Sequence, residues 1–416
     1  MTELNWGGNY AYRAGRLHRP SSVEAVRQVV SRSRRLRVLG TRHSFTGIAD
    51  STELLSLDAL APDVVVDHSA QSVTVSASVS YGALAHALAA EGLALHNLAS
   101  LPHISVAGAV ATATHGSGDA NGNLATAVAR LELVTSSGEI LSAKRGDADF
   151  DGMVVGLGAL GAVTRVTLDV EPAYAVRQRV FEGLDWDALL ERFDELSASG
   201  YSVSVFTRWG DRVDQVWVKS RVTDAPATLR DELLGAIPAT LERHPILGLD
   251  PVNCSPQLGA PGPWSERLPH FRMGFTPSNG DEIQSEYLLP RRHAVAAIRA
   301  LRDLAGTIRP VLQVSELRTI AADSLWMSPQ HGQDTLGIHF TWKLDQDAVE
   351  RALADVEAAL APFGARPHWG KLFLAEAAAV GPLYERLDDF ARLVERLDPR
   401  GAFRNDWLDA HVLGGA

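Results

Sequence analysis

The stretch from Ser100 to Gly118 constrains the fold of this chain more than any other segment, because small residues dominate it. Glycine, alanine, serine and threonine fill most of its positions, and bulky side chains are few. So dense a run lets a backbone come close to a flat ligand, with hydroxyl groups as hydrogen-bond donors. The alternative is a tight contact between two secondary-structure elements. The length of the run favours the ligand.

Two further stretches have the same character. In residues 38–45 a short buried strand runs into Gly-Thr-Arg-His-Ser, whose consecutive amides can form a concave nest for a pyrophosphate. Considered alone, this segment is explained better by an ordinary turn with a surface histidine. Residues 156–163 (Gly-Leu-Gly-Ala-Leu-Gly-Ala-Val) again combine small residues with a few apolar ones.

Several common site motifs are missing from the sequence. It has no G-x-G-x-x-G after a strand, no P-loop, no H-E-x-x-H and no G-x-S-x-G. A Rossmann nucleotide site, a metalloprotease and an α/β-hydrolase therefore lose support. We expect a ligand site built in another way, without a metal.

The chain has 416 residues, which is more than one ordinary core and predicts two interlocked domains. In the first 172 residues we expect helices over 22–36 and 81–91, strands over 37–39, 72–78, 128–135, 139–143 and 162–169, a helical turn over 149–158 and a loop-rich stretch over 93–118. From Pro172 onward we expect strands over 174–181, 202–209, 213–219, 312–320 and 335–343, helices over 186–198, 291–305 and 382–397, and a long ordered loop over 245–280.

Charge and cysteine content narrow the partners and the compartment. A net charge of −11 without a basic tract argues against nucleic acid. No apolar run reaches membrane-spanning length, no signal peptide is visible, and the single Cys254 cannot form an intrachain disulfide, so we expect a cytoplasmic protein. Only four lysines occur among many arginines, a bias that codon usage explains but that makes each remaining lysine notable.

Two strands carry candidate site residues. In 312–320 the alternation puts Glu316 and Arg318 on an otherwise apolar face, which is costly unless the charges are paired or used. The two side chains either form a structural ion pair at the edge of a sheet or bind the vicinal hydroxyls of a ligand. In 335–343 Gly337, His339 and Thr341 share the polar face, which either contacts solvent or lies against a ligand.

Together the three small-residue stretches resemble the vanillyl-alcohol-oxidase-type flavoprotein superfamily, and most closely its bacterial alditol oxidase (xylitol oxidase) branch. The G-[ST]-x-H-S-F loop of that branch matches Gly40 to Phe45 here. The phrases Ala99 to Gly108 and Thr114 to Gly118 also match, and the resemblance continues through residues 251–254, 263–264 and 367–371. It therefore covers essentially the whole chain. Arg42 is the one departure inside the first loop, and we expect it to leave a flavin linkage intact.

The resemblance implies an α+β protein: a two-subdomain FAD-binding (PCMH-type) domain over 1–172, an α/β substrate or cap domain with a mostly antiparallel sheet over the flavin at 173–370, and a C-terminal segment, 371–416, that returns to the first domain. It further implies FAD held covalently through His43. The other implied cofactor contacts are Gly40, Thr41, Arg42, Ser44, Phe45, Ser100, Ser105, Gly108, Thr112, Ala113, Thr114, His115 and Val163.

The same resemblance implies a substrate site and a reaction. The substrate residues would be Ser100, Glu316, Arg318, His339, Thr341 and Lys371, with His339 or Lys371 as the proton acceptor. The reaction would oxidise the C1 hydroxyl of a polyol such as xylitol or sorbitol by hydride transfer to the flavin, with O2 reduced to hydrogen peroxide, in a monomer. A sugar-1,4-lactone oxidase or dehydrogenase is the nearest alternative, and a flavin- or carbohydrate-binding protein without turnover is the non-enzymatic one.

Overall fold

Two small sheets form the N-terminal part of the chain. The computed structural model describes residues 3–223, 232–274 and 282–414. Strands β1 (Arg16–His18), β3 (Glu53–Ser56) and β2 (Leu36–Leu39) make a parallel sheet in that order. Strands β4 (Val64–Asp67), β5 (Ser72–Ser76), β9 (Ala162–Asp169), β7 (Val128–Val134) and β8 (Ile140–Lys144) make an antiparallel one. The strands expected over 72–78, 128–135, 139–143 and 162–169 are confirmed to within two residues.

Helix α1 (Val23–Arg32) precedes the parallel sheet and is shorter than the pattern predicts. The Oγ of Ser22 accepts a hydrogen bond from the amide of Ala25, which fixes the start of the helix. The predicted extension to residue 36 is wrong. Leu36 already belongs to β2, where its amide donates to the carbonyl of Ala402, and this tertiary pairing ends the helix early.

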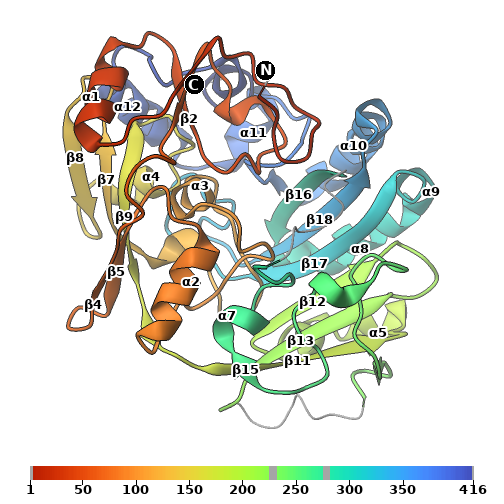
Figure 1. Ribbon diagram of the computed structural model, residues 1–416. Coiled ribbons are helices and arrows are strands. Elements are labelled where there is room, and N and C mark those ends of the chain that lie inside the picture. The colour runs from red at the N-terminus through yellow and green to blue at the C-terminus, as the bar shows by residue number, and fades with distance from the viewer. Residues whose placement is uncertain (1–2, 224–231, 275–281, 415–416) are drawn as a thin grey trace.

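The loop-rich stretch 93–118 contains more regular structure than expected. It includes β6 (Leu93–Ala94) and the short helix α3 (Val106–Ala111), while α2 (Tyr81–Ala90) precedes it and α4 (Phe150–Val154) follows. Small residues suit both α3 and a close ligand contact, so residue type alone did not separate the two. In Figure 1, α2 and α3 lie between the N-terminal sheets and the larger sheet on the right.

A large antiparallel sheet forms the second half of the molecule. In the described part of the chain its order is β14-β11-β13-β12-β17-β18-β16-β19, with β15 also paired to β11. The strands are β11 (Ala175–Glu182), β12 (Ser202–Thr207), β13 (Gln215–Arg221), β14 (Ile237–Pro238), β15 (Gly262–Pro263), β16 (Glu282–Pro290), β17 (Leu312–Ile320), β18 (Thr335–Lys343) and β19 (Arg366–Pro367). A two-residue strand β10 (Glu171–Pro172), paired with β6, connects the two halves. The predicted bounds of 312–320 and 335–343 are confirmed.

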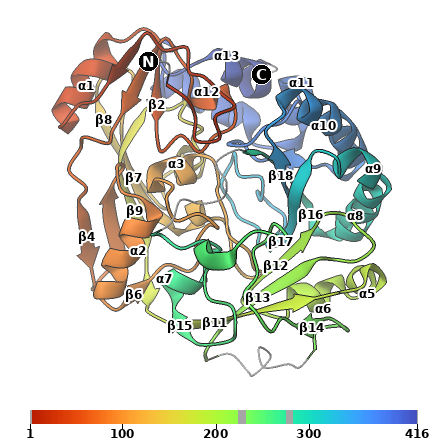
Figure 2. The ribbon, with the colours of Figure 1, turned by 45° about the vertical axis from the view of Figure 1, so that its right-hand side comes forward.

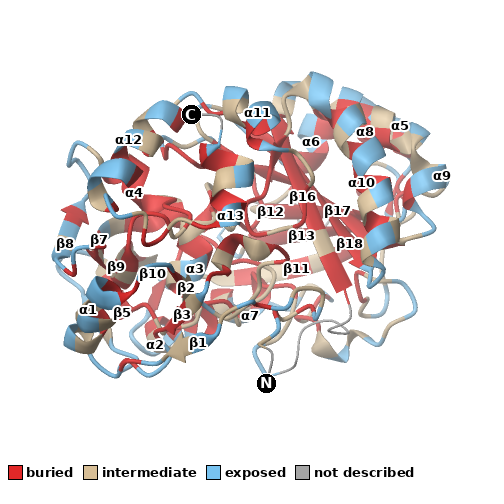
Figure 3. Ribbon diagram, turned by 90° about the horizontal axis from the view of Figure 1, so that it is seen from above, coloured by how far each residue is buried: buried red, intermediate tan, exposed pale blue. Residues whose placement is uncertain are grey.

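Helices cover the outer face of this sheet. They are α5 (Trp186–Glu191), α6 (Phe193–Ser197), α8 (Ala294–Asp303), α9 (Ala305–Ile308) and α10 (Gln346–Leu360). In α10 the buried side chains are Val349, Ala352, Leu353, Val356 and Leu360, the spacing of a single apolar stripe. Figures 2 and 3 show α5, α8, α9 and α10 along this outer side, with the buried strands behind them. The other face of the sheet therefore turns toward the N-terminal half.

The segment 245–280 is the long loop that its composition predicts, with the short helix α7 (Trp264–Arg267) inside it; residues 275–280 lie outside the described ones. After β19 come α11 (Ala377–Val380), α12 (Leu387–Leu397) and α13 (Asp406–Leu408). The Asn405 side-chain amide donates to the carbonyls of Gly47, Ile48 and Asp50, so this segment contacts the N-terminal half. The boundaries at 172 and 370 stay predictions. No helix in the described ranges combines the length and the apolar character that a bilayer crossing requires.

Candidate active site

A cavity of about 320 Å³ lies between the small-residue stretches and the inner face of the large sheet. The residues lining it include nearly all of those predicted for the cofactor and the substrate: Gly40, Thr41, Arg42, His43, Ser44, Phe45, Ser100, Ser105, Gly108, Thr112, Thr114, His115, Val163, Glu316, Arg318, His339, Thr341 and Lys371. Ala113 is the exception, because it is fully buried and does not line the cavity. Three segments far apart in the sequence thus meet at one site.

The loop after β2 has the features of an anion nest. Among the described residues, no partner accepts a hydrogen bond from the amides of residues 41–44. Arg42 has a φ of +63°, the left-handed conformation that turns successive amides toward one side. Its guanidinium pairs with Glu3 at 2.5 Å, and its carbonyl accepts from the amide of Trp6. The free amides and this turn fit a pyrophosphate.

His43 offers an unused ring nitrogen at the cavity. Its Nδ1 lies 3.1 Å from Oγ1 of Thr41, while Nε2 is buried without a hydrogen-bond partner. Burial lowers the pKa of His43 to about 4, so the ring is neutral and keeps a lone pair. The ring stacks on Trp6, with 5.3 Å between centroids. An orphaned, neutral imidazole nitrogen at the wall of the cavity fits covalent attachment to a flavin.

Glycines in the three stretches allow the close packing there. A Cβ on Gly40 or Gly108 would come within 3.0 or 2.8 Å of Oγ of Ser105, so neither position has room for a side chain. The third stretch is held by Arg37, which donates to the carbonyls of Leu157, Gly158 and Phe403 from a fully buried position. The backbone around the cavity is therefore tied to β2.

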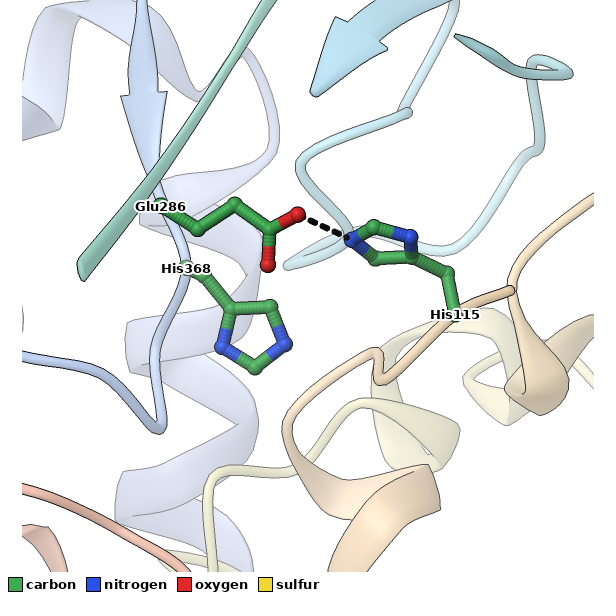
Figure 4. Close-up of side chains that lie close together, drawn as sticks. All are labelled: His115, Glu286 and His368. Atoms are coloured by element: carbon green, nitrogen blue, oxygen red, sulfur yellow. Dashed lines mark ion pairs between the residues drawn. The ribbon is translucent and has the colours of Figure 1, made fainter. Parts of the chain in front are cut away.

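The end of the cavity at the large sheet is organised by Glu286, a residue that sequence reasoning missed. The carboxylate lies 2.7 Å from Nη2 of Arg318 and 2.6 Å from Nζ of Lys371. Nε2 of His115 lies 3.3 Å from the same carboxylate (Figure 4). Burial by itself would raise the pKa of Glu286, but Lys371 and Arg318 hold that pKa well below its usual value. Glu286 is therefore an anion between two cations.

The register of the sheet places these groups in one row. Glu286 on β16 faces His339 on β18, and His339 faces Glu316 on β17. Because paired residues on one face of a sheet stand about 5 Å apart, the three side chains share one patch of the inner face. His339 and Thr341 are buried, so the reading of a solvated polar face is wrong.

Arg318 pairs most closely with Glu286 and not with Glu316, the partner that the sequence predicts. Its Nε lies 3.6 Å from Oε2 of Glu316, a weaker contact than the one with Glu286. Glu316 instead accepts from Nε2 of His270 at 2.9 Å. Strand β17 lies between β12 and β18 in the sheet, so a structural ion pair at a sheet edge is also wrong. Ser100 is close, with its Oγ 3.4 Å from Nη1 of Arg318.

Lys371 and His339 form a direct pair. Nζ of Lys371 lies 2.8 Å from Nδ1 of His339, and Nε2 of His339 lies 3.1 Å from Oγ1 of Thr341. The turn carrying Lys371 is held at both ends: the amide of His368 donates to the carbonyl of Glu286, and the amide of Phe45 donates to the carbonyl of Gly370. Lys371 therefore joins the sheet to the loop that carries His43.

Comparison with known proteins places this geometry in a family. Residues 16–144 match the family described as FAD binding domain, and residues 278–411 match D-arabinono-1,4-lactone oxidase. An alditol oxidase of Streptomyces sp. is 49% identical over 409 residues, which cover 97% of each chain. The chain belongs to the alditol oxidase family. It is therefore a FAD-dependent oxidoreductase, as the sequence predicts.

More distant similarities agree with the alditol oxidase assignment. An L-gulono-1,4-lactone dehydrogenase of Mycobacterium tuberculosis is 29% identical, covering 99% of this chain and 98% of its own. Among solved structures, a solvent-stable cholesterol oxidase superposes with a TM-score of 0.76 at 13% identity, covering 98% of this chain and 96% of that one. At that identity the likeness shows the fold alone. Together with the match to the FAD binding domain family, it confirms the predicted α+β architecture of an FAD-binding protein.

His115, Glu286 and His368 have the spacing of metal ligands, since their candidate atoms lie within 4.8 Å of one another (Figure 4). Two observations argue against a metal. Arg318 and Lys371 already bind the Glu286 carboxylate, and these two positive charges would repel a divalent cation. Nδ1 of His368 also accepts from the amide of Gly370. We interpret the cluster as part of the polar wall of the alditol oxidase site.

Glu286, His270 and His368 are among the polar lining residues that sequence reasoning missed, and it also missed Lys219, which contacts His270 from outside the cavity. Glu286 lies in β16, whose two glutamates give it weak strand character. His270 comes from the aperiodic loop. Lys219 alone carried a signal, because lysine is rare in this chain and the strand expected over 213–219 ends on it.

Proposed function

We propose that this protein oxidises the terminal C1 hydroxyl of a small polyol such as xylitol or sorbitol, using FAD attached to His43 and reducing O2 to hydrogen peroxide. The observation that carries the proposal is the single cavity in which the His43 loop meets Glu286, Glu316, Arg318 and Lys371. Open-chain polyols present a row of hydroxyls, and charged groups that alternate in sign suit such a row. The 49% identical alditol oxidase supports the same substrate class.

The cofactor would be held by the loops already described. The amides of residues 41–44 would bind its pyrophosphate, and Nε2 of His43 would carry the covalent bond. When bound, FAD supplies the hydride acceptor and passes the electrons on to dioxygen. The other predicted contacts stay as proposed, except that Ala113 does not line the cavity and is not proposed as a contact.

Arg318 would stabilise the negative charge that develops on the C1 oxygen, and Lys371 would add to this as it takes up the proton. Both side chains are buried and fixed by Glu286, so they need no reorganisation when the charge appears. Once Lys371 holds the proton, Glu286 leaves the pair with one net positive charge rather than two, which lowers the cost of burying both groups. Removing water from the cavity strengthens this effect.

The proton of the C1 hydroxyl would go to the pair formed by Lys371 and His339. Burial and the Arg318 charge lower the pKa of Lys371, against the opposing effect of Glu286. Burial and Lys371 hold the pKa of His339 well below its usual value, so His339 is neutral. In the hydrogen-bonded arrangement both ring nitrogens of His339 are engaged, and this favours neutral Lys371 as the first proton acceptor with His339 orienting it.

The remaining polar groups would bind hydroxyls along the rest of the polyol. Oε2 of Glu316 can accept from a hydroxyl, because His270 occupies only Oε1. Ser100 lies beside Arg318 and Thr341 lies beside His339, and both hydroxyls would add neutral hydrogen bonds. This division gives the Arg318 and Lys371 side chains to the reacting end, and the Glu316 carboxylate with the two hydroxyls to the rest of the polyol.

A sugar-1,4-lactone is the alternative substrate, favoured by the match of residues 278–411 and by the 29% identical dehydrogenase. Turnover on xylitol, sorbitol and L-gulono-1,4-lactone, measured with an oxygen electrode and a peroxide assay, decides between them. We expect polyol turnover with stoichiometric peroxide. Turnover of the lactone alone, or reduction of a dye without oxygen uptake, would refute the proposal, and a yellow protein inactive on all three would indicate binding without turnover. The cytoplasmic location and the monomeric state stay predictions.

A further inference from the structure

Lys219 is a buried lysine that lies outside the cavity. It is on β13 and only 1% exposed, and Nζ donates to the carbonyl of Leu268 and lies 3.0 Å from Nδ1 of His270. No carboxylate among the described residues lies within ion-pair distance of it. A buried ammonium without a direct counterion is costly, so a lysine kept here needs a reason. Its hydrogen bond to an imidazole supplies one.

The contact with Lys219 determines which nitrogen of His270 carries the proton. An ammonium can only donate, so Nδ1 of His270 must accept and the ring proton must sit on Nε2. Nε2 lies 2.9 Å from Oε1 of Glu316 and therefore donates to it. Edge contacts with Phe206 and Trp217, at centroid distances of 5.4 and 5.1 Å, hold the ring in that plane.

We propose that Lys219 is a positioning residue for substrate binding, which acts through His270 to keep Glu316 ionised and oriented as a hydroxyl acceptor. The role of Glu316 in this inference rests on the proposed polyol oxidation, whereas the predicted tautomer of His270 does not depend on it. In the other tautomer the lone pair of Nε2 would face the carboxylate, and Glu316 would have to turn away or take up a proton. A protonated Glu316 is a poorer acceptor for a substrate hydroxyl.

The charges around the three residues agree with this arrangement. Burial and Lys219 lower the pKa of His270 to about 4, so its ring is neutral. Burial by itself would raise the pKa of Glu316, but Arg318 and His270 bring it well below the usual value. Burial lowers the pKa of Lys219 to about 7, against the charge of Glu316, with Arg318 and Cys254 also contributing. A neutral amine at that position can still donate to both acceptors.

The kinetic test compares Lys219→Met with Lys144→Met, whose lysine is exposed on β8. We expect Lys219→Met to lower kcat/KM for xylitol by roughly tenfold, mostly through KM, the scale of one weakened charge-assisted hydrogen bond. In a Glu316→Gln background the same substitution should change kcat/KM by less than about twofold, because residues acting through one another are not additive. Equal losses in both backgrounds would show general damage and overturn the inference.

A second pair of variants tests the His270 step. His270→Gln keeps a donor near Nε2 and an acceptor for Lys219, whereas His270→Met keeps only the volume. We expect the Gln variant to stay within about threefold of wild type while the Met variant loses roughly tenfold. An equal loss of kcat/KM in the two variants would contradict the proposal that Lys219 acts on Glu316 through His270. Should Lys219→Met not fold, this pair decides the question by itself.

The tautomer itself can be observed without any turnover. In ¹⁵N-histidine-labelled protein, with His270 assigned through His270→Gln, the ring should show the neutral Nε2–H pattern. The Nδ1–H tautomer in the wild type would overturn the inference even if the enzyme oxidises polyols. Conversely, the expected tautomer in a protein that does not oxidise polyols would contradict only the proposed function.

Discussion

Glu286 and Lys371 are 85 residues apart in the chain, yet Nζ of Lys371 lies 2.6 Å from Oε2 of Glu286 in a buried ion pair. The pair joins β16 to the turn after β19, where residues 368–370 form backbone hydrogen bonds both to the large sheet and to the His43 loop. Arg318 approaches the other oxygen of the same carboxylate. One anion thus assembles two cations at the point where a reacting hydroxyl would lie.

Replacing Glu286 with Gln should remove that anion and leave the two cations facing each other. We expect kcat/KM for xylitol to fall by roughly tenfold or more, because breaking one partner of a buried pair costs several kcal/mol. Glu286 raises the pKa of Lys371, so its loss lowers that pKa further. If neutral Lys371 accepts the proton, the acidic limb of the pH–rate profile therefore moves to lower pH. Glu182→Gln, which breaks a partly exposed pair with Arg243, is the matched control; an unchanged profile in Glu286→Gln would contradict the assignment.

Replacing His43 with Ala should abolish covalent flavin. We expect wild-type protein denatured in SDS to keep yellow fluorescence on the chain, and His43→Ala to release it. His103→Ala is the control, because His103 is nearby in the stretch from Ser100 to Gly118 but does not line the cavity. Fluorescence that stays with the denatured His43→Ala chain would place the linkage at another residue.

Replacing Gly337 with Ala should disturb the site without unfolding the protein. A Cβ at this position would lie 3.3 Å from Oε1 of Glu286 and 3.2 Å from Cδ1 of Ile320. We expect kcat/KM to fall several-fold as Glu286 shifts, with a change in unfolding free energy of about 1–3 kcal/mol at most. Gly306→Ala has open space around its new Cβ and serves as control. If Gly337→Ala has full activity, the carboxylate has more freedom than the packing indicates.

Stability should depend on pH through Asp323. Its carboxylate accepts from Asn123 at 2.7 Å and from Ser328 at 2.6 Å, and burial raises its pKa to about 6. A raised pKa means that the folded state binds the proton more tightly than the unfolded chain, whose aspartates titrate near ~4. This contribution, on the order of 1–3 kcal/mol, is present below pH ~4 and is lost as pH rises to about 6.

Thermal unfolding midpoints of wild type and Asp323→Asn, measured from pH 4 to 7, test this assignment. The difference between the two proteins should change over that window, because the variant cannot titrate at this position. A difference that stays constant with pH would show that Asp323 has the same pKa in the folded and unfolded states.

The sequence by itself determined which residues share a face and which stretches contain no bulky side chains. Alternation put Glu316 with Arg318, and His339 with Thr341, because the two-residue period of a strand is a local property of the backbone. The small-residue stretches likewise predicted a closely approached ligand, and the resemblance supplied its identity as FAD.

Only the tertiary structure decided what these faces meet. The register between β16, β18 and β17 brings Glu286 beside His339 and Glu316, and the loop over the sheet brings His270 between Glu316 and Lys219 of β13. Register between strands that are tens of residues apart depends on long-range packing of both faces, which no local pattern encodes. For that reason Glu286, the residue that binds both site cations, could not be found from the sequence, although every partner it binds was.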